Sequence, residues 1–198
     1  MHSAATESMA TVGVLALQGD VREHRQALER LGVVTVKVRI PEDLENIDGL
    51  VIPGGESTTI GKLATLYGMM DPLRKVIGEG LPTYGTCAGL ILLSRALDQG
   101  EQPLLGVLDV VTRRNSFGGQ GNSFEADLEI EGIETPFRGV FIRAPWVIEA
   151  GDSVDVLSAW SGHPVMVRSH NMLASAFHPE LTDDDRVHAL LVNMIEEG

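Results

Sequence analysis

Apolar residues in the first half of the chain alternate between short continuous runs and helical spacings. Residues 12–18 and 50–55 are nearly continuous apolar runs, typical of strands covered on both faces. Residues 33–40 alternate aliphatic with polar side chains, which indicates a half-buried strand near a sheet edge. Residues 81–87 are strand-like, and residues 88–97 are apolar enough for a buried helix. This alternation of strand and helix predicts a parallel α/β sheet.

Capping residues mark where the helices are expected to begin and end. Asp20 and Glu23 have the spacing of a capping box, and Gly32 stands where a helix C-cap is expected. A second helix is expected to begin near residues 57–58. A third is expected to open at Asp71-Pro72, because proline at the first helical position loses no hydrogen bond.

The second half of the chain has a different pattern. Residues 104–177 contain several short strand-like runs without long helical spacings, and we expect antiparallel strands added beside the parallel core. Residues 182–198 have the spacing of a closing helix. The sequence therefore predicts one α/β domain over residues 11–198, with a mixed, mainly parallel sheet flanked by helices. Residues 1–10 are expected to form a flexible leader.

Charge and cysteine content narrow the possible functions. The 198 residues include 15 basic and 28 acidic side chains, for a net charge of −13, which disfavours nucleic acid and anionic membranes as partners. A single cysteine forms no internal disulfide and no cysteine-based zinc site. No apolar run is long enough to cross a membrane, and the first residues lack the pattern of a signal peptide. A cytoplasmic protein is expected.

The segment Gly85-Thr86-Cys87-Ala88-Gly89 has the G-x-C-x-G form of a nucleophile elbow between a strand and a helix. Small residues are needed there because the turn is tight and the flanking elements pack closely. A cysteine at a helix N-terminus has a stabilised thiolate, and the N–H of Ala88 could serve an oxyanion. The alternative is that Cys87 is only a small buried apolar residue.

His178-Pro179-Glu180 follows a strand-like run 91 residues after Cys87. A cysteine nucleophile needs a base, and that base needs an orienting carboxylate, so His178 and Glu180 fit these roles. An isolated surface turn is the alternative. His24 and His188 are expected on helices with structural or exposed roles, and the six histidines have no spacing typical of a metal site.

Pro53-Gly54-Gly55-Glu56-Ser57 ends another predicted strand. Paired glycines expose backbone N–H groups that suit an oxyanion or a carboxylate, although a plain glycine turn has the same appearance.

Together these three motifs resemble, in identity and order, those of the class I (triad-type) glutamine amidotransferases. The flanking segments narrow the resemblance to the glutaminase subunits of pyridoxal 5′-phosphate synthases. It extends from about Val12 to the C-terminus, and it rests on LALQGDVREH, PGGESTTIGKL, GTCAG, RNSFGGQGNSFE, FIRAP and SAFHPEL.

The resemblance implies a flavodoxin-like three-layer fold and hydrolysis of glutamine to glutamate and ammonia. It also implies delivery of the ammonia to a synthase subunit within a large hetero-oligomer, with no cofactor and no metal. Carried over, Cys87 is the nucleophile, His178 the general base and acid, and Glu180 its orienting group. The implied oxyanion donors are Gly55 and Ala88, and the implied glutamine-binding residues are Gly55, Glu56, Ser57, Arg114, Ile142 and Arg143.

One position departs from the family pattern. Gly119 stands in Arg114-Asn115-Ser116-Phe117-Gly118-Gly119-Gln120 where the family resemblance leads us to expect arginine. Three alternatives stay open: the glutaminase subunit of another amidotransferase, a cysteine hydrolase or chaperone-like protein with a similar elbow, and a non-catalytic regulatory module.

Overall fold

A seven-stranded sheet forms the centre of the computed structural model, which describes residues 9–114 and 123–198. Its strand order is β10-β11-β12-β4-β3-β1-β2. The five strands from β12 to β2 are parallel, whereas β10, β11 and β12 pair antiparallel. The bounds are β1 (Thr11–Leu15), β2 (Val34–Val38), β3 (Gly49–Ile52), β4 (Thr83–Thr86), β10 (Asp155–Trp160), β11 (His163–Ser169) and β12 (Met172–Ser175).

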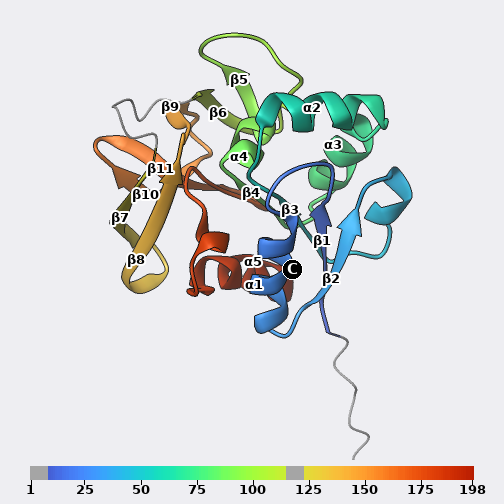
Figure 1. Ribbon diagram of the computed structural model, residues 1–198, viewed down its shortest axis with the longest axis horizontal. Helices are drawn as coiled ribbons and strands as arrows, with labels where there is room; N and C mark the ends of the chain where they lie inside the picture. The colour runs from blue at the N-terminus through green and yellow to red at the C-terminus, as the bar shows by residue number, and fades with distance from the viewer. Residues whose placement is uncertain (1–8, 115–122) are drawn as a thin grey trace, which may run out of the picture.

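Helices cover both faces of this sheet (Figure 1). One face carries α1 (Val21–Arg30) and α5 (Arg186–Glu197), and the other carries α2 (Ser57–Leu66), α3 (Met70–Gly78) and α4 (Ala88–Leu93). Two short 3₁₀ helices, η1 (Pro41–Leu44) and η2 (Pro179–Leu181), lie in connections. The result is the three-layer arrangement expected for a mainly parallel sheet.

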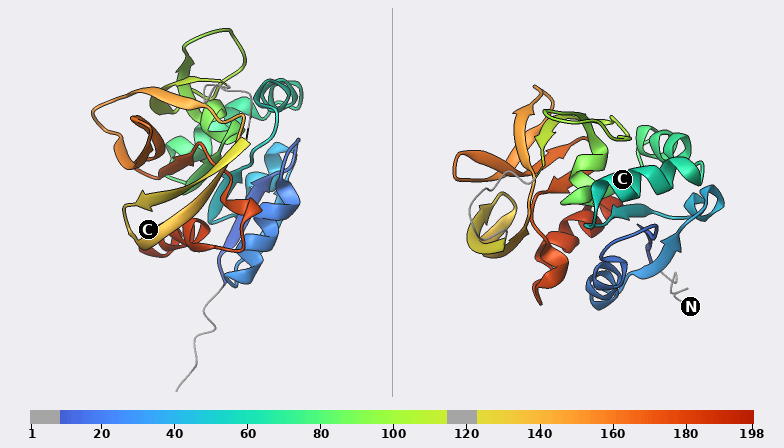
Figure 2. Two further views of the ribbon diagram at one scale, coloured as in Figure 1. Left: turned by 60° about the vertical axis from the view of Figure 1, so that its left-hand side comes forward. Right: turned by 45° about the horizontal axis from the view of Figure 1, so that its top comes forward.

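The remaining strands form two smaller sheets beside the centre (Figure 2). Strands β5 (Ser94–Leu97), β6 (Leu108–Arg113) and β9 (Trp146–Ala150) form one, and β7 (Ser123–Ile130) pairs with β8 (Ile133–Ile142) in an antiparallel hairpin. Apart from β5, these strands and β10 and β11 form antiparallel pairs, as the second half of the sequence predicts, whereas β5 pairs parallel with β6.

The core lies between the central sheet and its two helix layers. Every residue of β3, β4 and β12 is buried, which explains why their sequences are continuous apolar or small runs. Strand β2 is the edge strand that the alternation predicts, but it covers only part of residues 33–40, and its Val34 is exposed although the alternation places it on the buried face. The prediction of a single α/β domain with a mixed, mainly parallel sheet is therefore confirmed.

Three local predictions are wrong. The buried helix expected over residues 88–97 ends at Leu93, because Ser94 Oγ donates to the Ile91 carbonyl at 2.6 Å and the chain continues as β5. The third helix begins at Met70, one residue before Asp71. The last strand-like run was expected to be an added antiparallel strand, yet β12 pairs parallel with β4.

Parts of two predictions lie outside the described residues. These are residues 1–8 of the expected leader and the position of Gly119. Within the described part of the chain, no helix is both long and apolar enough to span a bilayer.

Candidate active site

Cys87 is held at a sharp turn between the end of β4 and the start of α4. Its backbone has φ 48° and ψ −98°, a conformation that L-residues rarely adopt. Its N–H donates to the carbonyl of Ser175 on β12 at 2.7 Å. Backbone strain of this kind is typical of functional positions, where the surrounding structure maintains it.

The glycines of the elbow are required by packing. A side chain on Gly89 would overlap the carbonyl oxygen of Ile52 in β3. A Cβ on Gly85 would lie 2.8 Å from the carbonyl carbon of Gly89. The G-x-C-x-G pattern therefore allows α4 to approach both strands closely enough to present the thiol at their carboxyl ends.

His178 reaches the same place from the neighbouring strand. It follows β12 closely, and its backbone N–H donates to the Val140 carbonyl of β8 at 2.8 Å. Because β12 and β4 are adjacent and parallel, their carboxyl ends bring His178 beside Cys87, close enough for the cysteine to raise the pKa of the imidazole. Both side chains are almost fully buried.

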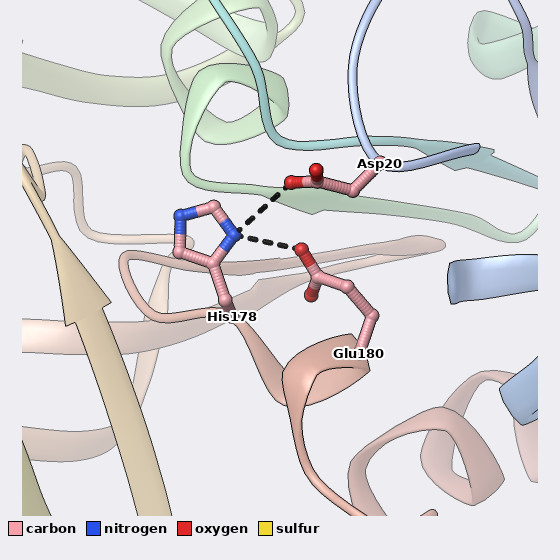
Figure 3. Close-up of side chains that lie close together, drawn as sticks. All are labelled: Asp20, His178 and Glu180. Carbon is pink, nitrogen blue, oxygen red and sulfur yellow. Dashed lines mark hydrogen bonds and ion pairs between the residues drawn. The ribbon is translucent and has the colours of Figure 1, made fainter. Parts of the chain in front are cut away.

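Two carboxylates meet the Nδ1 atom of His178 (Figure 3). Glu180 Oε1 lies 2.7 Å from it, as the His-x-Glu spacing predicts. Asp20 Oδ2 lies 3.5 Å from the same nitrogen, from the loop between β1 and α1.

Asp20 is a site residue that the sequence reasoning missed, as it missed Gln18, Ile91 and Leu181 in the cleft described below. The predicted capping box does not form, because the Asp20 side chain makes no capping hydrogen bond to α1. The position of Asp20 directly after a buried strand was a better signal than the capping-box spacing, because ligands of α/β sheets bind at that edge of the sheet.

Charge and burial oppose one another at this histidine. Burial lowers the pKa of His178, but hydrogen bonds with Asp20, Cys87 and Glu180 outweigh burial and raise that pKa above its usual value. Burial raises the pKa of the Glu180 carboxyl, and its hydrogen bond to His178 opposes that rise. The arrangement favours a protonated imidazole between the thiol and the carboxylates.

A cleft of about 340 Å³ opens above the thiol. It is lined by all but one of the predicted catalytic and binding residues; Glu180 lies behind His178 instead. The lining residues are Gln18, Asp20, Gly55, Glu56, Ser57, Cys87, Ala88, Ile91, Arg114, Ile142, Arg143, His178 and Leu181.

The PGGES turn forms one wall of the cleft. A Cβ on Gly54 would lie 2.5 Å from His178 Cε1, so only glycine fits against the imidazole. Gly55 has φ +154°, and the following N–H, of Glu56, donates to Gln18 Oε1 at 2.8 Å. The Glu56 carboxylate caps α2 by accepting from the N–H groups of Thr58 and Thr59, at 3.2 and 2.8 Å. The Thr59 hydroxyl also donates to it at 2.7 Å, and this bond, followed by the backbone bonds, lowers the pKa of Glu56.

Two arginines also line the cleft. Arg114 Nη1 donates to Thr58 Oγ1 at 3.0 Å and to Gln102 Oε1 at 3.2 Å, which ties it to the start of α2. Arg143 directly follows β8 with φ 45°. Both cations can therefore meet an anionic ligand group in the cleft.

Asp20, His178 and Glu180 also offer donor atoms within 4.8 Å of one another, a spacing that could hold a metal ion. The histidine atom involved, Nδ1, is the one bonded to Glu180. A metal there would replace that bond, so the donor set serves the orientation of His178 better than a cation.

Comparisons with known proteins agree with this geometry. The sequence model of the SNO glutamine amidotransferase family matches residues 14–197. The chain is similar to two proteins named pyridoxal 5′-phosphate synthase subunit PdxT. The one from Streptomyces coelicolor is 55% identical, with 93% of each chain covered, and the one from Bacillus velezensis is 51% identical, with 96% of each chain covered. A crystal structure described as a glutamine amidotransferase superposes with a TM-score of 0.90 at 52% identity, covering 93% of this chain and 98% of that one. A glutamine amidotransferase from Thermotoga maritima (12% identity, TM-score 0.62, 96% of this chain and 86% of that one) shares the fold.

Proposed function

The chain belongs to the SNO glutamine amidotransferase family, and from that premise we propose that it is the glutaminase subunit of a pyridoxal 5′-phosphate synthase. It hydrolyses L-glutamine to L-glutamate and ammonia, and the ammonia passes to a synthase subunit that makes pyridoxal 5′-phosphate. Relatives with that name at 51–55% identity over nearly the whole chain support this assignment. This proposal rests chiefly on one observation: Cys87, His178 and Glu180 lie together at the ends of adjacent parallel strands.

Catalysis begins with the thiolate of Cys87, which attacks the side-chain amide carbon of glutamine. The amide oxygen becomes an oxyanion, and backbone N–H groups of Gly55 and Ala88 stabilise it. His178, held protonated beside the thiolate, gives its proton to the leaving ammonia. The C–N bond breaks and a γ-glutamyl thioester on Cys87 remains.

Water then hydrolyses the thioester. His178, now neutral, removes a proton from the attacking water, and the thiolate leaves as glutamate forms. Glu180 keeps the Nδ1 side of the imidazole fixed through both steps, so that the other ring nitrogen faces the reacting atoms.

Substrate binding uses the groups at the mouth of the cleft. Arg114 or Arg143 pairs with the α-carboxylate of glutamine, since both are cations and both line the cleft. The backbone carbonyl of Ile142 accepts from the α-ammonium, and Ser57 and Glu56 complete the pocket.

The synthase subunit is proposed to complete the oxyanion site. The Gly54 carbonyl accepts from the Asp20 N–H at 3.1 Å, and the Glu56 N–H donates to Gln18. Hydrogen bonds with Asp20 and Gln18 thus hold both peptide links around Gly55 in the free subunit. A flip has to exchange one of these bonds for a contact with the partner, while the backbone conformations open to glycine are themselves close in energy. The free subunit is therefore expected to be weakly active, which protects glutamine from wasteful hydrolysis.

The test measures glutamate release from glutamine with and without the synthase subunit, for the parent chain and for Cys87→Ala. We expect release that depends on Cys87 and rises on addition of the synthase. With glutamine labelled by ¹⁵N at the amide, the label should enter the pyridoxal 5′-phosphate ring. Equal release without the synthase would contradict the dependence on a partner, and release by Cys87→Ala would contradict the mechanism.

The assembly and its location are further parts of the proposal. We expect a large hetero-oligomer with the synthase, detectable by light scattering of the mixture. A reactive, unpaired Cys87 suits the reducing cytoplasm, and cell fractionation tests that location.

A further inference from the structure

A line of buried polar groups continues from Glu180 into the protein, away from the cleft. His24 on α1 and His188 on α5 are both fully buried, and His24 Nδ1 lies 2.9 Å from His188 Nε2. On its other side, His24 Nε2 lies 3.1 Å from Thr86 Oγ1 and 3.5 Å from Glu180 Oε2. One imidazole thus touches both the residue before the nucleophile and the carboxylate behind the base.

The partners of these atoms decide which nitrogen of His24 carries its proton. If Nδ1 were protonated, a bare Nε2 would face the Glu180 carboxylate, and His188 would keep a buried N–H at Nδ1, where no partner exists among the described residues. If Nε2 is protonated, its N–H points toward Thr86 and Glu180, and His188 donates from Nε2. The second arrangement is favoured because it places an N–H, rather than a nitrogen lone pair, against the buried Glu180 carboxylate.

Both histidines are neutral in this arrangement. Burial lowers the pKa of His24 well below its usual value, and the neighbouring His188 and His178 lower it further. Burial also lowers the pKa of His188; Asp185 opposes that effect and Arg30 adds to it. His24 therefore presents a dipole to Glu180 and leaves the negative charge of that carboxylate available to His178.

We propose that His24 is a positioning residue for the glutaminase reaction, whose neutral Nε2–H holds the Oε2 side of Glu180 so that Oε1 stays on His178. This rests on the proposed function. Glu180 Oε2 is buried and accepts no hydrogen bond from residues 9–114 and 123–198, and His24 Nε2, 3.5 Å away, is a polar atom placed against it. An apolar pair of equal volume would avoid desolvating two imidazoles, and packing alone gives no reason for them.

The test compares two variants of His24. His24→Gln places an amide N–H near the position of Nε2, whereas His24→Leu fills the space without a donor. We expect His24→Leu to lower the kcat for glutamate release about tenfold, because the donor that faces the buried charge of Glu180 is lost, with KM within about twofold. His24→Gln should stay within about threefold of the parent.

Alkylation of Cys87 by iodoacetamide gives a second readout that needs neither glutamine nor the synthase. Without the His24 donor, the Glu180 carboxylate is less stable and becomes protonated at higher pH. The acid limb of the alkylation rate should therefore move to higher pH in His24→Leu and remain in place in His24→Gln. Equal losses in both variants with an unmoved pH profile would show a packing role and overturn the proposal.

Nitrogen chemical shifts of ¹⁵N-histidine in the unmodified chain test the tautomer directly, even if His24→Leu does not fold. We expect the Nε2–H form at His24, and the Nδ1–H form would overturn the proposal. Failure of the proposed function would give a different result. The parent chain would release no glutamate in the presence of the synthase, although its His24 tautomer and its alkylation profile were as expected.

Discussion

The imidazole of His178 lies between two carboxylates that have different surroundings. Glu180 is almost fully buried and bonds to Nδ1 at 2.7 Å, whereas the Asp20 side chain is 36% exposed and lies 3.5 Å away. The buried carboxylate fixes the direction of the ring. The exposed one acts mainly through its charge, so the two can be separated by experiment.

Replacing Asp20 with asparagine removes that charge at nearly constant shape. Because Asp20 is one cause of the raised pKa of His178, Asp20→Asn should lower this pKa and deprotonate the imidazole at lower pH. The alkaline limb of kcat/KM should then move about one pH unit toward acid. Glu23→Gln, a neighbouring charge on α1, is the matched control, and an unmoved limb in Asp20→Asn would contradict the assignment.

The conformation of Cys87 predicts a conflict between stability and activity. A residue with φ 48° and ψ −98° is strained unless it is glycine. Cys87→Gly should therefore be more stable than Cys87→Ala by about 1 kcal/mol in urea unfolding, although neither can form the thioester. A glycine variant less stable than the alanine variant would show that the turn carries no strain.

Residue types and spacing predicted most of the site, but not its whole geometry. Cys87, His178 and Glu180 could be named because each has a chemistry that few other residues supply. Asp20 was assigned to a helix cap because aspartate is common there, and only the loop after β1 turns its side chain toward His178. His24 could not be found, since its partners come from α5, β4 and η2.

Close packing of α4 against β3 is what places the thiol at the sheet edge. Gly89 on α4 meets the Ile52 carbonyl with no room for a side chain. By contrast, Gly78 at the end of α3 has no atom within 4 Å of the place where a Cβ would be. A side chain would therefore clash at Gly89 and find open space at Gly78.

Alanine at each position tests this difference. Gly89→Ala should cost about 3 kcal/mol of unfolding free energy and reduce alkylation of Cys87, because α4 must move away from β3. Gly78→Ala should leave stability unchanged or raise it by up to about 1 kcal/mol, since alanine favours helix. Urea titration of both variants gives the comparison, and similar values for the two would be inconsistent with the close approach.

Periodicity predicted the elements wherever one face or both faces are buried, as in β1, β3 and α1. Periodicity failed for Ser94–Leu97. This segment has the composition of the last turn of the predicted helix, and only its pairing with β6 makes it a strand. Periodicity also missed the direction of β12. Parallel and antiparallel strands have the same side-chain period, so the neighbour β4 decides.

At the scale of the whole molecule, the two buried histidines make the fold sensitive to acid. His24 and His188 are neutral inside the protein, and burial lowers the pKa of His188 to about 4. In the unfolded chain both histidines titrate near 6.5. Their contribution to stability is therefore present above pH 6.5 and is lost as the pH falls toward 4.

Urea midpoints between pH 7 and pH 4 test this sensitivity. His188 alone should cost the parent chain about 3 kcal/mol over that range, His24 should add to the loss, and His188→Leu should lose less. His170→Asn is the control, because His170 is exposed and asparagine tolerates its φ of 51°. A decline of the same size in all three proteins would assign the effect to other groups.

The position of β12 in the sheet has a consequence for how the molecule matures. This strand is inserted between β11 and β4 although it comes late in the sequence, so the central sheet is not continuous until residues 172–175 take their place. The same step delivers His178 to Cys87. A nascent or half-folded chain thus carries a thiol that has no base and no orienting acid. Completion of the sheet and the onset of chemistry are one event, and a misassembled chain hydrolyses no glutamine.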